Sequence, residues 1–188
     1  MDKTLLNTGL KYGAIGALIF IIVVIAAWQV DLSLFLNPLV TYALPLLVFG
    51  LAVYAQIDAR KKKGGFIDFS NALVVFIIAV VVALLGQFII NYLVFNVFDP
   101  GAKLELQELI IQEALEMVEK MGKIFGMEEQ MSNAMNEDML REVMEEQDSS
   151  GKDTASLILS FIMSSVIYTI GGLISAAIIK RNPPVQFD

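Results

Sequence analysis

The chain has 188 residues, of which 56% are hydrophobic and 18% are charged, with a mean hydropathy of +0.68 and a net charge of −7. Soluble domains are about 45–50% apolar and about 25% charged, so this excess of apolar residues in long blocks indicates a bilayer protein. The chain contains no cysteine and no histidine. Disulfides, thiolate sites, Ser-His-Asp triads and His-ligated zinc are therefore excluded within it.

Two membrane spans are predicted in the first third of the chain. Residues 12–30 form a 19-residue run without a charge, which at about 1.5 Å per residue crosses a hydrocarbon core of roughly 30 Å. This run is too long for a signal-peptide core of about 7–15 residues, so we expect an uncleaved span. Residues 39–57 form the second predicted span, which starts after Asn37-Pro38 and is kinked at Pro45.

Two further spans are predicted at residues 70–97 and 155–179. The third begins with Ser70-Asn71 as N-cap residues, and the fourth is stopped by "KRNPP". The third is longer than a bilayer requires, which predicts a tilt or a projection beyond it. The sequence thus predicts one all-α integral-membrane domain over residues 1–188. Four transmembrane helices would form it, with an acidic helical hairpin outside the membrane in residues 99–153, between helices three and four.

Basic residues gather at one predicted end of the four spans. They are Lys3, Lys11, Arg60, Lys61, Lys62, Lys63, Lys180 and Arg181. The positive-inside rule then predicts cytoplasmic termini, with residues 99–153 in the periplasm of a bacterial inner membrane. The lysines of the "RKKK" cluster can also contact anionic lipid headgroups, at about 1 kcal/mol per cation. A nucleic-acid site is disfavoured, because the cluster is short and lies between two spans.

Acidic residues dominate the predicted outer segment. Residues 99–153 hold 15 acidic and five basic residues. Apolar side chains at three-four spacing predict a first helix that ends at Gly126 and a second at about residues 128–147. The simplest arrangement has their apolar faces meet each other or lie on the outer membrane interface. The carboxylate pairs lack an EF-hand spacing, so a solvated acidic face is favoured over a Ca²⁺ or Mg²⁺ site.

Methionines are concentrated in the same segment, where seven of the nine lie between residues 117 and 144. Thioethers suit Cu(I), and methionine also adapts to varied partner surfaces. An ordinary amphipathic core stripe is the favoured interpretation, because spacing at i, i+4 is expected of any amphipathic helix. If the methionines instead bind a protein partner, the candidate partner face consists of Met117, Met121, Met131, Met135 and Met139.

A polar cluster is predicted inside the membrane. Gln87 and Asn91 share one face of the third span, and Ser160, Ser164 and Tyr168 form a ridge on the fourth. These groups can line a polar route between spans three and four. The favoured interpretation is that they form hydrogen bonds across a helix interface, worth about 0.6–2 kcal/mol each.

Several strings of the chain together resemble a known family. They are "KKGGFIDFSNAL", "GMEEQMSNAMNEDMLREVMEEQ" and "AAIIKRNPP". With these motifs the chain resembles, over nearly its whole length, a bacteroidete family of small four-span membrane proteins classed as a domain of unknown function. The resemblance implies a bacterial inner-membrane protein with four helices, and it brings no catalytic residues.

Two functional hypotheses follow. The first is a non-enzymatic membrane subunit or scaffold that presents its acidic, Met-rich hairpin to a partner. The alternative is a small transporter or channel with a polar route between spans three and four. Besides the lipid bilayer, the expected partners are other membrane proteins or a second copy of the chain. We expect no nucleic acid, cofactor or metal, because no motif for nucleotide, metal or catalytic chemistry is present.

Overall fold

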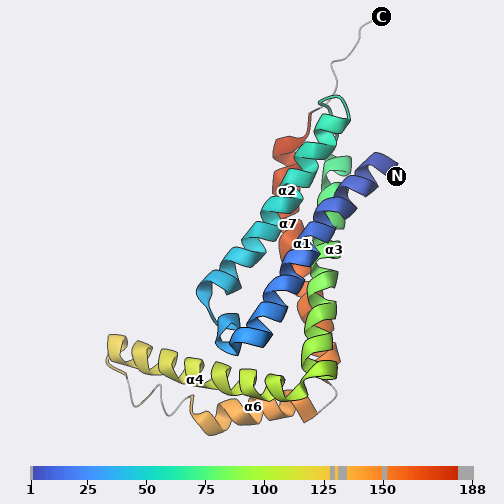
Figure 1. Cartoon of the computed structure of the whole chain (residues 1–188). Coiled ribbons are helices and arrows are strands. Elements are labelled where there is room, and N and C mark those ends of the chain that lie inside the picture. The colour runs from blue at the N-terminus through green and yellow to red at the C-terminus, as the bar shows by residue number, and fades with distance from the viewer. Residues whose placement is uncertain (1, 128–129, 131–134, 150–151, 182–188) are drawn as a thin grey trace, which may run out of the picture.

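The computed structural model describes residues 2–127, 130, 135–149 and 152–181, and within these residues the fold is all-helical. Its only β-type pairing is one isolated bridge between Ile67 and Arg181. The α-helices are α1 (Lys3–Val30), α2 (Leu44–Lys62), α3 (Phe69–Tyr92), α4 (Pro100–Phe125), α6 (Glu137–Ser149) and α7 (Lys152–Ile179), shown in Figure 1. Three shorter segments are the 3₁₀ turn η1 (Leu32–Phe35) and the π-helical turns η2 (Leu39–Ala43) and η3 (Leu93–Phe98).

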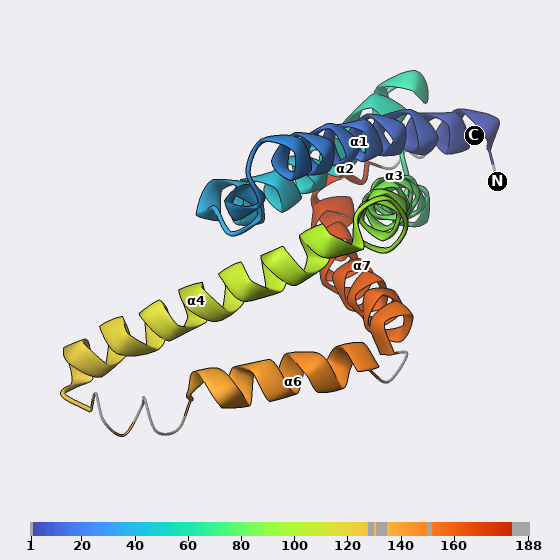
Figure 2. The same ribbon diagram turned by 60° about the horizontal axis from the view of Figure 1, so that its bottom comes forward.

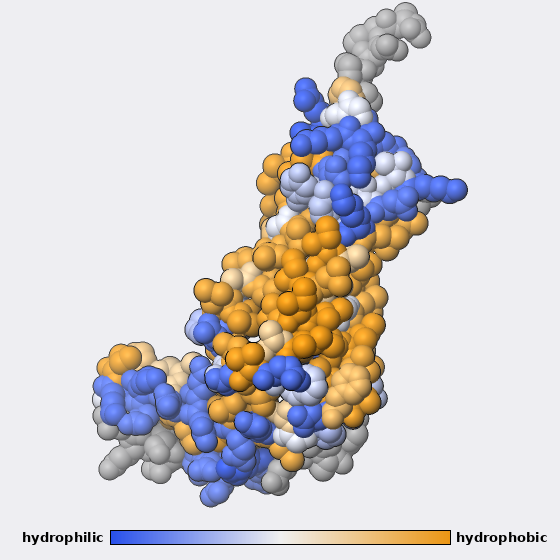
Figure 3. Space-filling model, in the orientation of Figure 1, coloured by the Kyte–Doolittle hydropathy of each residue, from blue (hydrophilic) through white to orange (hydrophobic). Residues whose placement is uncertain are grey.

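Four helical segments are long and apolar enough to cross a membrane. They are Lys3–Val30, Leu39–Lys62, Phe69–Phe98 and Phe161–Ile179. They form a bundle whose surface carries a broad hydrophobic belt between two hydrophilic ends (Figure 3). The predicted all-α membrane architecture with four spans is therefore confirmed.

The two ends of the bundle differ in charge. We call the end that holds the start of α1, the loop between α2 and α3, and the end of α7 the basic end (Figure 1). The opposite end, which holds η1, α4 and α6, is the acidic end. The loop between α2 and α3 makes a tight turn at Gly64 and Gly65, which have φ values of 74° and 92°.

Helix boundaries lie outside the predicted limits at three places. Helix α1 begins nine residues early at Lys3, where the Asp2 carboxylate accepts a hydrogen bond from the Thr4 amide. Helix α2 continues beyond the predicted end to Lys62. Helix α3 begins one residue early and is capped by Asp68, which accepts from the Asn71 amide at 2.7 Å, and not by Ser70 or Asn71. In α1 and α2, hydrophilic residues extend the helix beyond its apolar run, which hydropathy alone does not register.

Helix α3 is the centre of the bundle, since it packs against α1, α2 and α7. Its contact with α1 is the most extensive, because glycine and alanine face each other there. A Cβ built on Gly86 would lie 2.4 Å from the Cβ of Ala17. Towards the basic end the core consists largely of small side chains that are fully buried, among them Ala55, Ala59 and Ala72. This permits close backbone approach in the absence of a strong hydrophobic drive between helices.

Helix α4 leaves the end of α3 and runs across the acidic end of the bundle, with α6 beside it (Figures 1 and 2). Asp99 caps its start, Pro100 occupies its first turn, and Gly126 ends it with a φ of 66°, as predicted from sequence. The second predicted acidic helix, at 128–147, is described only from Glu137 onward. Residues 128–129 and 131–134 lie outside the described part of the chain.

Candidate functional site

A cavity of about 480 Å³ lies between α2 and α7, in the half of the bundle towards the acidic end. Its floor is formed by α1 and α3, through Phe20, Leu84 and Gln87. Ser164 and Tyr168 of α7 supply its other polar side chains. Three residues of the predicted polar cluster, Gln87, Ser164 and Tyr168, therefore line one cavity.

A second cavity of about 350 Å³ adjoins the first, with which it shares Phe20, Pro45 and Gln87. It lies between α1, α3 and the start of α2, and Leu106 of α4 closes it at the acidic end. Asn91 lines this second cavity and not the first. The expected single cluster between spans three and four is thus divided. Gln87 lies where the two cavities meet. Spans one and two also border this space, which was predicted to lie between spans three and four alone.

The shape of α2 explains why space remains here. Pro45 lies in its first turn and has no backbone N–H, so the carbonyl of residue 41 loses its usual helical partner. The chain before it forms the wide turn η2 in place of a regular α-helix. The predicted kink at Pro45 is therefore a change of helix type. Helix α2 contacts α7 only over a short stretch, and the two helices leave the cavity between them.

Hydrogen bonding within the two cavities is incomplete. The Tyr168 hydroxyl donates to the Pro45 carbonyl at 2.9 Å and so links α7 to α2. The Thr41 hydroxyl donates to the Phe35 carbonyl at 3.1 Å. The Asn91 Oδ1 atom is buried and has no hydrogen-bond partner within the described chain. The predicted cross-helix bonding is therefore found for Tyr168 but not for Asn91. The side chain of Ser160 lies outside the described part.

Two buried polar residues at the basic end were missed by the sequence reasoning. Gln56 is fully buried within α2 and donates to the Ala72 carbonyl at 3.2 Å. Thr8 is also buried in α1, and its hydroxyl donates to the Thr4 carbonyl at 2.7 Å. Gln56 could have been recognised from sequence as an amide at the end of an apolar run. Nothing in the sequence marked Thr8 as buried, because it precedes the predicted first span.

The basic cluster makes contacts within the chain. Lys62 Nζ lies 2.8 Å from the Asp58 carboxylate and 3.1 Å from the Thr8 hydroxyl. Lys63 pairs with Asp2 at 2.6 Å, and the Arg60 guanidinium donates to the Ile179 carbonyl at 3.2 Å. Lys61 is exposed and makes no ion pair within the described chain. These cations therefore join α1, α2 and α7 in addition to any role in orientation.

The residues that directly follow α7 contact the loop between α2 and α3 at the basic end. Arg181 and Ile67 exchange two backbone hydrogen bonds, of 2.8 and 3.0 Å. The Arg181 guanidinium also lies over the Phe66 ring, 5.9 Å from its centroid. Lys180 is exposed. The loop that separates spans two and three is thus held by the residues that follow span four.

At the acidic end, one carboxylate connects the bundle to α4. The Trp28 indole donates to Asp99 Oδ2 at 3.1 Å, and the Ala102 amide donates to Asp99 Oδ1 at 3.0 Å. The indole hydrogen bond, and then the backbone one, lower the pKa of Asp99. Asp99 therefore fixes the start of α4 against the end of α1.

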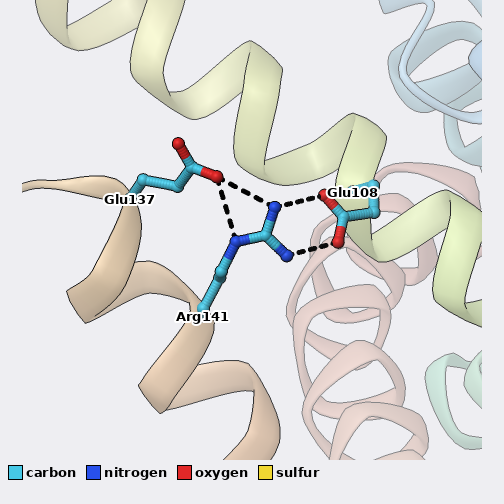
Figure 4. A network of polar contacts seen from close by, with 3 residues as sticks. All are labelled: Glu108, Glu137 and Arg141. Atoms are coloured by element: carbon cyan, nitrogen blue, oxygen red, sulfur yellow. Dashed lines mark hydrogen bonds and ion pairs between the residues drawn. The ribbon is translucent and has the colours of Figure 1, made fainter.

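Arg141 joins α6 to α4. Its guanidinium forms a two-pronged ion pair with Glu108, one arm of which is 2.7 Å long, and it also contacts Glu137 at 2.9 Å (Figure 4). Hydrogen bonds from Arg141 lower the pKa of Glu108, and the two carboxylates raise the pKa of Arg141. All three side chains are 40–56% exposed, so the net stabilisation is modest.

The methionines of the candidate partner face are exposed. Met117 is 58% exposed and Met139 48%, and Met121 and Met135 are exposed as well. Met131 lies outside the described residues. The favoured interpretation, a core stripe, is wrong for the four described methionines. Helix α6 approaches α4 at Glu108, which lies on the side of the α4 helix opposite Met117.

Among known protein families, a family model described as "Protein of unknown function (DUF4199)" matches residues 8–181 of the chain. The chain belongs to this family. No curated protein and no solved structure matches it.

The DUF4199 match confirms the resemblance to a domain of unknown function. It covers the first span from residue 8 onward, the other three spans, both cavities and most of the basic end. The DUF4199 chain is accordingly a membrane protein, and the family description does not define its activity. The features that bear on its function are the two ends of the bundle and the cavities.

Proposed function

We propose that the chain is a non-enzymatic, multi-pass membrane subunit that presents α4 and α6, as an acidic helical hairpin, to a protein partner. The observation that carries this proposal is the exposed apolar surface on an otherwise charged arm. Ile124 is 76% exposed and Met117 58%, and no other part of the described chain covers them. Apolar side chains grouped outside the membrane spans are typical of an interaction site.

The charge around this surface indicates the character of the partner. The α6 segment Glu137–Ser149 holds six acidic residues and a single base, Arg141, which is already paired with Glu108. A partner surface that is apolar at its centre and basic at its rim would complement it. Methionine suits such a contact, because its flexible thioether repacks against varied shapes.

A photo-crosslinking amino acid at Met117 or Met139, in native membranes, tests the proposal. We expect a discrete adduct with one protein from each position. The matched control is Glu119, which lies on the opposite, charged face of α4 and should give little adduct. Lipid adducts alone at Met117 would instead place the α4 stripe on the bilayer surface and refute the protein partner.

We further propose that both termini are cytoplasmic in a bacterial inner membrane and that residues 99–153 are periplasmic. The concentration of lysine and arginine at the basic end supports this orientation. The absence of cysteine makes labelling clean, so a cysteine at Ser149 should react with an impermeant reagent in whole cells. A cysteine at Gly64 should react only after permeabilisation, and the reverse pattern would overturn the orientation.

A second candidate function is a small transporter or channel, and the two adjoining cavities favour it. They extend from Leu106 at the acidic end, past Asn91, to Gln87, and their mostly apolar lining includes these two amide side chains. None of the described lining residues is charged, so a solute should be small and uncharged, such as glycerol. We expect proteoliposomes to show glycerol flux that Gln87→Leu combined with Asn91→Leu reduces. Unchanged flux in the double variant would rule out this route.

A further inference from the structure

We propose that the two adjoining cavities bind an uncharged amphipathic lipid with a hydroxyl group in its head, such as a diacylglycerol. Its head would lie against Gln87 and Asn91, and its acyl chains would leave between α2 and α7. This goes beyond both proposed functions, because it concerns what occupies the cavities and requires neither a protein partner nor transport.

The cavity between α2 and α7 opens sideways. Leu46 on α2 and Ile167 on α7 both line it, and they are 68% and 66% exposed. Both belong to membrane-spanning segments, so the surface they expose faces the hydrocarbon region. An entrance bordered by two such side chains admits an acyl chain directly from the bilayer. Its volume of about 480 Å³ is within the range of small-molecule sites, roughly 300–1,000 Å³.

The inner wall needs hydrogen-bonding partners. In the second cavity, Asn91 Oδ1 is a buried acceptor without a partner among the described residues, so it calls for a donor such as a hydroxyl group. Gln87 lies where the two cavities meet and offers both a donor and an acceptor. The Tyr168 hydroxyl already donates its proton to the Pro45 carbonyl, so its oxygen can only accept a further hydrogen bond. These groups together are suited to a head that carries a hydroxyl group and ester carbonyls.

Charge excludes the common phospholipids. The described residues that line the two cavities are apolar apart from Thr41, Gln87, Asn91, Ser164 and Tyr168, and none of them is charged. A phosphate placed among these side chains would lose its hydration without gaining a cation, which is strongly unfavourable. An uncharged head does not incur this cost.

The test uses the full chain in phosphatidylcholine nanodiscs that contain a photoactivatable diacylglycerol. We expect its adducts to map to lining residues of α2 and α7, and a photoactivatable phosphatidic acid to label these positions far less. Gln87→Leu keeps the side chain near its original size but removes hydrogen bonding. It should lower the labelling by about fivefold, the effect of losing one hydrogen bond to a neutral group.

Two α7 variants separate occupancy from general damage. Ser164→Phe adds a ring inside the cavity and should abolish labelling. Val166→Phe adds the same ring on the opposite, exposed face of α7 and should leave labelling unchanged. Equal labelling by the two lipid probes, or labelling that neither Gln87→Leu nor Ser164→Phe reduces, would overturn the proposal. If Ser164→Phe does not reach the nanodiscs, the result for Gln87→Leu decides.

Discussion

Replacing Gly86 with alanine is expected to lower the free energy of unfolding by about 1–3 kcal/mol, the usual cost of overpacking a close contact. The added Cβ would lie 2.4 Å from the Cβ of Ala17 and 2.9 Å from its Cα. The Cα belongs to the α1 backbone, so no side-chain rotation relieves the contact. Helices α1 and α3 would have to separate along the most extensive interface of the bundle. Thermal unfolding in mild detergent, followed by circular dichroism, measures the change.

Gly50 provides the matched control. It also lies within a membrane helix, α2, but a Cβ built there meets nothing within 4 Å. Gly50→Ala should therefore leave stability unchanged or raise it by up to about 1 kcal/mol, because alanine favours the helix. Equal destabilisation by the two variants would show that the contact between Gly86 and Ala17 is not the cause.

Acidification is expected to release α4 from the end of α1. The pKa of Asp99 is lowered in the folded chain, first by the Trp28 indole and then by the Ala102 amide. Ionised Asp99 therefore stabilises the fold above the ordinary carboxyl pKa of 3.8, and this contribution is lost as the pH falls through the lowered value. Trp28 is the only tryptophan, so its fluorescence reports the contact. We expect its emission to shift to longer wavelength below pH 3.8.

Two substitutions of Asp99 isolate this effect from the other carboxylates. Asp99→Asn keeps one acceptor oxygen, for either the Trp28 indole or the Ala102 amide, and does not titrate, so its emission should lose the acid transition. Asp99→Ala removes both acceptors, and its emission should be shifted at every pH. An acid transition of the same size in Asp99→Asn would assign the effect to other groups.

The exposed apolar surface of α4 and α6 at the acidic end shows what sequence patterns cannot predict. Spacing at i, i+4 correctly placed Met117 and Met121 on one face of a helix. It could not show what that face meets, and a core stripe was favoured although the side chains are exposed. In α6 the side chain that joins the two helices is Arg141, which binds Glu108 on the side of α4 opposite Met117. An ion pair 33 residues apart has no signature in local spacing.

The sequence alone determined the four spans, the charge difference between the two ends of the bundle and the stop at Gly126. These properties depend on sums over consecutive residues or on the conformation of a single one, so neighbours in space do not alter them. Only the tertiary structure decided that Gln87 lies between two cavities, that Asn91 is separated from Ser164, and that Thr8 is buried. Those outcomes depend on how each helix is rotated about its axis and where it diverges from the next. The close contact between Gly86 and Ala17 and the wide turn before Pro45 are features of this kind, and hydropathy contains no term for either.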